Sequence, residues 1–222
     1  VEIQKCAPYA VQTQQSDADM AGLVLKQMAS DIGSGAEVGY VNVAGIAPLD
    51  RRDVVWQKAV KDNGWKQLFK TGTYTDSSAT DTAPMVVAAL QANPGVKAIY
   101  APYDELSKGT LSALQQLGIK NVKVYGADIS NADIELMTAA GSPWAATGAT
   151  DPNAIGAAVL RTLFLDMAGQ LKGKNVQFPP ILITQDMLKS KNIKNMDDLR
   201  AAEPSLNIAD VSGADWIPSV TF

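Results

Sequence analysis

Polar and aromatic side chains follow two apolar strand-like segments between residues 98 and 128, and they are the first candidates for chemistry in this sequence. The first segment ends in Ala-Pro-Tyr-Asp, which places Tyr103 and Asp104 directly before a helical pattern. The second ends in Gly-Ala-Asp, which places Asp128 at the corresponding point. In an open parallel sheet, the carboxyl ends of the strands border the crevice in which ligands bind. This βαβ pattern therefore points to a ligand-binding site.

Most catalytic centres need residue types that are scarce in this sequence. The 222 residues include no histidine and one cysteine, Cys6. The lack of histidine excludes Ser-His-Asp and Cys-His nucleophile systems and the usual zinc hydrolase ligands. One cysteine excludes an internal disulfide and a cysteine-built zinc site, and we interpret Cys6 as a small buried apolar residue. Carboxylate pairs could still support glycosidic chemistry, so composition disfavours an enzyme without excluding one.

Charge and hydropathy narrow the choice of partners. The net charge of −4 and the pI near 4.8 disfavour a nucleic-acid footprint, which requires a basic face. No apolar run approaches the roughly 18 residues of a membrane span, so we expect a soluble chain. The sequence opens at Val1 without an export signal, as expected of either a processed mature chain or an internal fragment. Without a glycine-rich phosphate loop, a calcium loop or a metal cluster, we expect no cofactor and no metal.

Helical and strand-like patterns alternate along most of the chain, which predicts an α/β fold: a doubly wound, mostly parallel sheet flanked by helices. We expect Pro84 in the first turn of its helix and a single helix over 189–202. The remaining tail should be irregular and should pack through Trp216, Ile217 and Phe222. The helical patterns span residues 16–33, 50–63, 82–93, 105–117, 131–139 and 152–170, and the strand patterns span 37–44, 66–73, 98–101, 122–128, 144–149 and 181–184.

Several of these segments, in this order, resemble the sugar-binding receptors of bacterial ABC importers, the ribose-binding (type I) kind of periplasmic protein. Each segment alone is a weak motif, but their order and spacing over residues 8–190 are fairly specific. The matching segments are SDADMAG at 16–22, VNVAGIAPLDRRDVVWQKAV at 41–60, NPGVKAIYAPYDELSKGTLSAL at 93–114, VKVYGADIS at 122–130, WAATGATDPNAIGAAVLRTL at 144–163 and FPPILITQDML at 178–188.

The resemblance implies two similar α/β lobes with the ligand between them, of which this chain holds the second. It divides the chain into a C-terminal ligand-binding lobe at 7–150, a crossing helix at 151–177 that normally belongs to the first lobe, a returning strand at 178–190 and a C-terminal tail at 191–222. The stripe of Ile155, Val159, Leu163 and Met167 on helix Pro152–Gln170 would then lack its usual partner. We expect this stripe either to form a dimer contact or to fold back on its own lobe.

The resemblance also suggests which residues hold the sugar. Arg52 aligns with the ligand arginine of the family, where a guanidinium could donate to two sugar oxygens at once. Its neighbour Arg51 is expected to make surface contacts only. Asp128 corresponds to an aspartate that accepts from sugar hydroxyls, although a role as N-cap or Asx turn before Ser130 is the alternative. Trp56 falls at a position that is usually a core aromatic, and Trp65 is expected to pack as well.

Other candidates follow from looser matches. Tyr103 could stack on a sugar ring or donate its hydroxyl, while Asp104 reads more readily as the N-cap of the next helix. Tyr74 and Asp76 match an aromatic and an acid of the family in a segment of unusual length. Asp151 precedes Pro152 and is interpreted first as a helix cap and second as a ligand contact.

The function implied is that of a solute-binding component, without catalytic residues, that delivers a sugar to a membrane permease. It would work in the periplasm or outside the cell, where a cell-surface lipoprotein is one form. The alternatives are the effector domain of a LacI-like transcription regulator and a sensor module for a membrane signalling protein. A carbohydrate-active enzyme that pairs Asp76 or Asp81 with Asp128 is the catalytic alternative.

Overall fold

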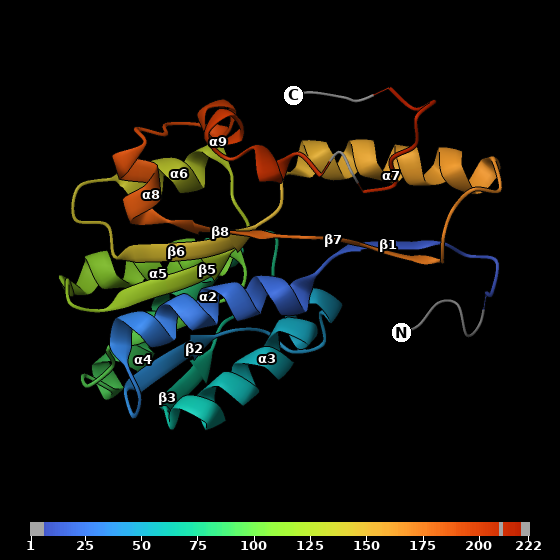
Figure 1. The fold of residues 1–222 in the computed structure, drawn as a ribbon. Coiled ribbons are helices and arrows are strands. Elements are labelled where there is room, and N and C mark those ends of the chain that lie inside the picture. Colours follow the sequence, from blue (N-terminus) through green and yellow to red (C-terminus); the bar gives the residue numbers. More distant parts are fainter. Residues whose placement is uncertain (1–6, 209–210, 219–222) are drawn as a thin grey trace.

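A six-stranded sheet forms the centre of the molecule (Figure 1). The computed structural model describes residues 7–208 and 211–218. The strand order is β3-β2-β4-β5-β6-β8, and every neighbouring pair is parallel except β6 with β8, which is antiparallel. These strands are β2 (Glu37–Val41), β3 (Lys66–Thr71), β4 (Ala98–Ala101), β5 (Lys123–Ala127), β6 (Trp144–Ala149) and β8 (Ile181–Thr184).

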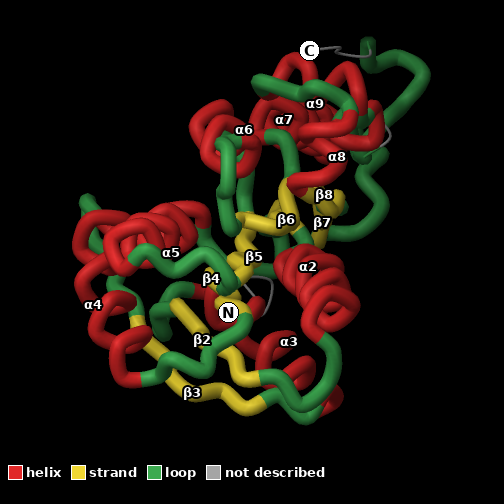
Figure 2. Tube along the Cα trace, turned by 90° about the vertical axis from the view of Figure 1, so that its left-hand side faces the viewer, coloured by secondary structure: helices red, strands yellow, loops and turns green. Residues whose placement is uncertain are grey.

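Helices cover both faces of this sheet, which confirms the predicted doubly wound α/β class (Figure 2). One face packs against α2 (Asp17–Ile32) and α3 (Ala47–Asn63). The other face packs against α4 (Ser78–Ala92), α5 (Asp104–Leu117), α6 (Asn131–Thr138), α8 (Gln185–Ser190) and α9 (Met196–Ala202).

Stacked aromatic rings fix α3 to the sheet. The ring centroids of Tyr40 and Trp56 are 4.7 Å apart, and those of Trp56 and Tyr100 are 5.5 Å apart. Trp56 has no exposed surface, and its Nε1 donates to Gln67 Oε1 at 2.7 Å. Trp65 is also buried, so the expectation that both tryptophans pack is confirmed. Offset stacking of this kind adds specificity to the burial of large apolar rings.

Two helix predictions are wrong in their boundaries. Helix α4 begins at Ser78, so Pro84 lies inside it and not in its first turn. The residues before Pro84 are therefore helical although they are rich in Ser, Thr and Asp. The expected single helix over 189–202 is two helices, because Asn192 adopts a left-handed backbone with φ of 54° and ends α8. Asn195 then caps α9 by accepting from Asp198 N at 2.9 Å.

A second, smaller unit lies beside the sheet. Strands β1 (Gln12–Gln15) and β7 (Asn175–Phe178) pair in parallel, and α7 (Pro152–Met167) runs alongside them (Figure 1). Neither strand was expected as such, because β1 is entirely polar and β7 has only two apolar residues among its four positions. Helix α7 packs through small residues, with Ala154 and Ala158 against Phe178 and Ile208. A short 3₁₀ helix, η1 (Pro204–Leu206), leads into the tail that supplies Ile208.

The apolar stripe predicted on this helix points largely outward. Val159, Leu163 and Met167 are 37%, 50% and 76% exposed, so the stripe does not fold back on the lobe. The reason is that the tail crosses a different face of α7, where Arg161 Nη2 donates to Ile208 O at 3.0 Å. The expected anchor Trp216 is 51% exposed. Cys6 and Phe222 lie outside the described residues. Among the described residues, no helix combines the length and apolar character that a membrane crossing requires.

The close approach of α2 to β6 depends on a glycine. A Cβ at Gly148 would lie 2.7 Å from Met20 O and 2.9 Å from Met20 Cγ, whereas a Cβ at Gly22 on α2 would meet no atom within 4 Å. We therefore expect Gly148→Ala to lower the free energy of unfolding by about 1–3 kcal/mol through overpacking. The control Gly22→Ala should raise it by about 0.5–1 kcal/mol, since alanine is the better helix former. Urea unfolding of both variants checks this; equal midpoints would contradict the packing described.

Candidate ligand-binding site

The ends of β2, β4 and β5 meet the first turns of α2 and α3, and Arg52 lies at the centre of this junction. Its side chain is 2% exposed. Nε donates to Asp17 Oδ1 at 2.9 Å, and Nη1 donates to Pro102 O at 2.5 Å and lies 3.4 Å from Asp128 Oδ2. Burial acts to lower the pKa of Arg52, but the carboxylates of Asp128 and Asp17 outweigh it and the pKa is raised. The guanidinium is therefore a fixed cation with Nη2 not hydrogen-bonded to any described residue.

Asp128 lies beside this cation at the end of β5. Its backbone is left-handed, with φ of 75°, and Thr147 Oγ1 donates to its carbonyl at 2.9 Å. Burial raises the pKa of Asp128, although the neighbouring Arg52 acts in the opposite direction. The side chain keeps 33% of its surface exposed. Ser130, not Asp128, caps α6 by accepting from Asp133 N at 3.3 Å, so the N-cap alternative does not apply.

The two neighbouring arginines differ in exposure, but the expectation that Arg51 makes surface contacts only is wrong, because it pairs with the buried carboxylate of Asp17. Arg51 keeps 40% of its side chain exposed and pairs with the second oxygen of Asp17, with Nη2 to Oδ2 at 2.6 Å. Arg52 is turned toward the strand ends. The arrangement places one donor nitrogen of Arg52 and one acceptor, Oδ1 of Asp128, at the same junction, neither of them hydrogen-bonded to a residue that the structure describes. A donor and an acceptor side by side suit the hydroxyls of a sugar.

Two tyrosines extend this surface. The ring centroids of Tyr74 and Tyr103 are 6.0 Å apart, with planes tilted by 40°. Tyr74 is 57% exposed, and Tyr103 is partly buried at the N-cap position of α5. Asp104 is the first residue of α5 and pairs with Lys108 at 2.8 Å, so its predicted N-cap role is wrong. Burial, followed by the charge of Asp104, raises the pKa of the Tyr103 hydroxyl.

The remaining predicted acids lie in different settings. Asp76 is exposed in the loop before α4 and has no hydrogen bond within the described chain. Asp81, its alternative in an enzymatic pair, accepts locally from Thr75 Oγ1 at 2.7 Å. Asp151 caps α7 by accepting from Asn153 N at 3.0 Å, as expected. Arg200 contacts both of its oxygens, with Nε at 2.7 Å and Nη2 at 3.2 Å, so this buried carboxylate already has a structural role.

Two residues at the junction were not foreseen as part of a site. Asp17 holds Arg52, but its role depends on a contact 35 positions away. Asn42, directly after β2, is 4% exposed, and neither atom of its amide has a partner among the described residues. Its backbone N–H donates to Thr71 O at 2.8 Å, which holds it at the end of the sheet. The sequence feature that could have identified Asn42 is a polar residue at the end of an apolar strand.

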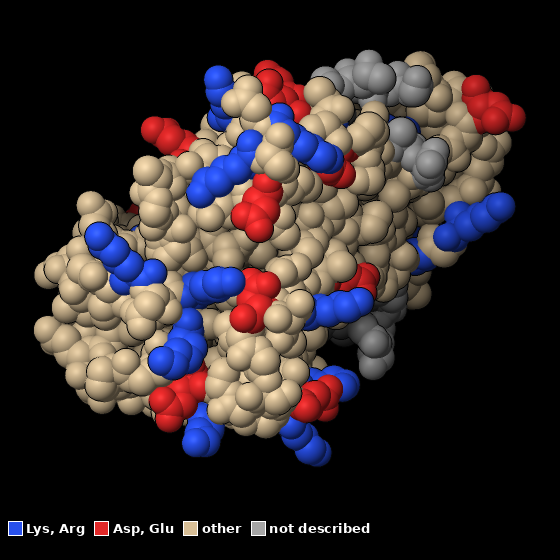
Figure 3. Space-filling model, turned by 60° about the vertical axis from the view of Figure 1, so that its left-hand side comes forward, with Lys and Arg blue, Asp and Glu red and all other residues tan. Residues whose placement is uncertain are grey.

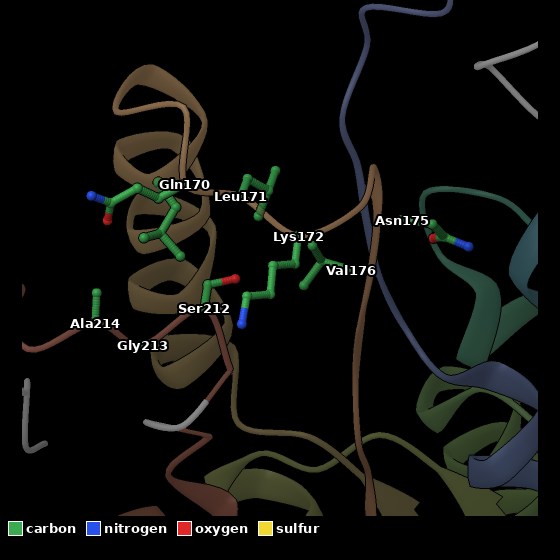
Figure 4. Close-up of a pocket in the computed structure, with 9 residues that line it drawn as sticks. Gln170, Leu171, Lys172, Asn175, Val176, Ser212, Gly213 and Ala214 are labelled. Carbon is green, nitrogen blue, oxygen red and sulfur yellow. The ribbon is translucent and has the colours of Figure 1, made fainter.

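A hollow elsewhere on the molecule contains none of the predicted ligand residues. It has a volume of about 730 Å³ and opens between the α7–β7 connection and the tail (Figure 4). Gln170, Leu171 and Lys172 line one side, and Ser212–Ala214 line the other. The end of the molecule in Figure 3 carries lysine, arginine and acidic side chains interspersed, without a continuous basic area in that view.

A buried guanidinium and a carboxylate thus lie at the carboxyl ends of parallel strands, which is where open α/β sheets usually bind ligands. The sequence matches the family described as "Periplasmic binding protein domain" over residues 5–171. The chain therefore belongs to this family, which is one of solute-binding proteins and not of enzymes.

Several solved structures are similar to this chain. A 5-methylthioribose transporter solute-binding protein from Thermotoga lettingae, in complex with 5-methylthioribose, is 37% identical with a TM-score of 0.86 over 92% of this chain and 64% of that one. A sugar ABC transporter protein from Yersinia enterocolitica is 32% identical with a TM-score of 0.84 over 92% and 62%. An ABC transporter periplasmic solute-binding protein from Actinobacillus succinogenes with bound D-allose, 18% identical with a TM-score of 0.73 over 86% and 68%, shares the fold. This chain thus spans less than two thirds of the first two relatives.

The pairing of Arg200 with Asp151 gives a stability prediction. Arg200→Met should lower the free energy of unfolding by about 1.5–3 kcal/mol, because it leaves a buried carboxylate with the α7 backbone as its remaining partner. The control Asp197→Asn removes the other acid that Arg200 contacts, whose side chain is 87% exposed, and should cost less than about 1 kcal/mol. Denaturant titration of both variants provides the comparison. Equal effects would show that the contact with Asp151 contributes no more than a surface pair.

Proposed function

We propose that this chain is the ligand-binding lobe of a solute-binding receptor that supplies a sugar or sugar-like ligand to an ABC importer. The free Arg52 Nη2 and the free Asp128 Oδ1 at one junction are the observation that carries this proposal. A donor and an acceptor from neighbouring elements suit the hydroxyls of a sugar, and Tyr103 and Tyr74 add aromatic surface for the C–H faces of a ring. Asp76 is included in the same proposed surface because it lies two residues from Tyr74. Asp151 is the weaker candidate for a ligand contact, because Arg200 already pairs with its carboxylate.

The partners and location follow from the family. The proposed partner is a membrane permease, and the proposed site of action is the periplasm or another exported location, including a lipoprotein at the cell surface. Two relatives above 30% identity are transport proteins, which favours import over a LacI-like regulator or a signalling sensor. Delivery would follow closure of two lobes around the ligand.

The outer face of α7 fits a receptor that continues beyond this lobe. Leu160, Leu163, Phe164 and Met167 are 47–76% exposed on one helix. Such a patch is typical of a contact surface in a soluble protein. Packing against the remainder of a two-lobe receptor is the proposal we favour, and a dimer through the same helix stays an alternative prediction.

The proposal is tested by titrating the ¹⁵N-labelled chain with 5-methylthioribose, D-allose and D-ribose. We expect amide shifts at Tyr103 and Asp128 with an affinity roughly in the millimolar range, because one lobe supplies only part of the contacts and does not enclose the ligand. Arg52→Lys should abolish these shifts, since lysine lacks the planar fork, and the matched control Arg51→Lys should not. Shifts confined to the hollow between Gln170 and Ala214, or no shifts at all, would contradict the proposed site. Micromolar affinity would contradict a second contributing lobe.

Protonation of Asp128 gives a second test. A sugar hydroxyl that donates to Asp128 requires the carboxylate, which is present above the pKa of this residue. Because burial raises that pKa, affinity should fall as the pH falls and should begin to do so above the ordinary aspartate range. The same titration between pH 7.5 and 4.5 measures this. In Asp128→Asn the affinity should be weaker and independent of pH; an unchanged pH profile in that variant would exclude Asp128 as the titrating contact.

A further inference from the structure

The carboxylate of Asp17 is shared by two neighbouring arginines of α3. Its Oδ1 accepts from Arg52 Nε at 2.9 Å, and its Oδ2 accepts from Arg51 Nε at 2.8 Å. The Asp17 side chain has no exposed surface. Charge-assisted hydrogen bonds in such a low-dielectric setting are short, strong and directional. Asp17 is therefore able to fix the orientation of the guanidinium that it contacts.

Asp17 is also placed where the chain passes between the six-stranded sheet and the β1–β7 unit. Ser16 N donates to Phe178 O at 2.9 Å, and Thr150 Oγ1 donates to Gln15 Oε1 at 3.0 Å. The connections that lead from the sheet to α7 and β7 are therefore hydrogen-bonded to the connection from β1, at residues one or two positions before Asp17. Any movement of β1 relative to the sheet would act directly on the first turn of α2.

The contact with Asp17 decides which nitrogens of Arg52 stay available. Nε is held by Asp17 and Nη1 by Pro102 O, while the 3.4 Å approach to Asp128 leaves that carboxylate only loosely engaged. If the Nε contact were lost, the guanidinium would be free to turn and pair with both oxygens of Asp128. A fork-to-fork pair of that kind would use up the free donor and the free acceptor together.

We propose that Asp17 is a positioning residue: it holds Arg52 so that Nη2 and Asp128 remain open to a ligand, and it ties this orientation to the segments that connect the two units of the fold. The consequence for sugar affinity rests on the proposed function. The orientation of Arg52 does not, because it is a property of the ligand-free protein.

The first measurement is the Nε–H resonance of Arg52 in the ligand-free ¹⁵N-labelled chain, identified by its loss in Arg52→Lys. Asp17→Asn keeps the side-chain volume and removes the charge. It should shift this resonance and speed its exchange with solvent at least about tenfold, the effect of losing a hydrogen bond between charged groups. Asp19→Asn is the matched control: Asp19 lies two residues further along α2, is exposed, and accepts from Ser16 Oγ at 2.5 Å. It should leave the resonance unchanged.

The second measurement is the affinity for 5-methylthioribose and D-allose, which Asp17→Asn should weaken at least about tenfold and Asp19→Asn should not. An unchanged Arg52 resonance in Asp17→Asn would overturn the positioning role whatever the sugars do. A changed resonance with unchanged affinity would overturn its link to the ligand. If the wild-type chain binds none of the sugars, a changed resonance still supports the orientation, and the proposed function is what fails. Should Asp17→Asn not fold, Asp17→Glu, which keeps the charge but displaces it, must shift the same resonance.

Discussion

A buried positive charge determines how the elements at this end of the molecule are arranged. The Arg52 side chain is 2% exposed, and an arginine in that position is costly unless carboxylates and carbonyls surround it. Asp17, Asp128 and the carbonyl of Pro102 supply that surrounding from α2, the end of β5 and the end of β4. Four separate elements, α3 included, are therefore held in one place by the requirement to compensate a single guanidinium.

The helix that carries Arg52 is anchored one turn further on. Trp56 lies four residues after Arg52, so both side chains project from the same face of α3. Trp56 packs against the rings of both Tyr40 and Tyr100, which lie side by side on the neighbouring strands β2 and β4. Apolar packing of Trp56 fixes the helix, and the ion pairs then fix the guanidinium of Arg52. Rigid placement of this kind is what a recognition site needs, because a loosely held donor would lose entropy on binding.

The sequence allowed the layers of the fold to be predicted much better than the site. Alternating helical and strand patterns are local, so the order of the elements and the parallel sheet could be read directly, and β6 and β8 were predicted with their observed ends. Errors arose where local preference and tertiary packing disagree. Segment 78–83 is rich in turn-forming residues yet begins α4, and the polar strands β1 and β7 are stabilised by pairing with each other.

Individual roles at the site depend on contacts between distant positions. Arg52 was found through the resemblance to a family, and Asp128 through its place at a strand end and the same resemblance. Asp17 was not found, since nothing in SDAD indicates a partner 35 residues later. For Asp151, the local role could be predicted and the distant contact could not. Its position before Pro152 correctly indicated a cap, but its pairing with Arg200, 49 residues away, could be seen only in the structure.

The two units of the chain differ in what they leave uncovered, and this bears on how a receptor of this family would work. The six-stranded sheet is covered on both faces, and its own core is complete. Within the described part of the chain, the β1–β7 pair has α7 and the tail beside it, and α7 turns its larger apolar side chains outward while packing through alanines. The Asp128 carboxylate at the end of β5 is partly uncovered as well, with 33% of its side chain exposed. Since a ligand bound to a single wall keeps much of its surface in water, firm retention at the proposed site would require a second surface that closes over it.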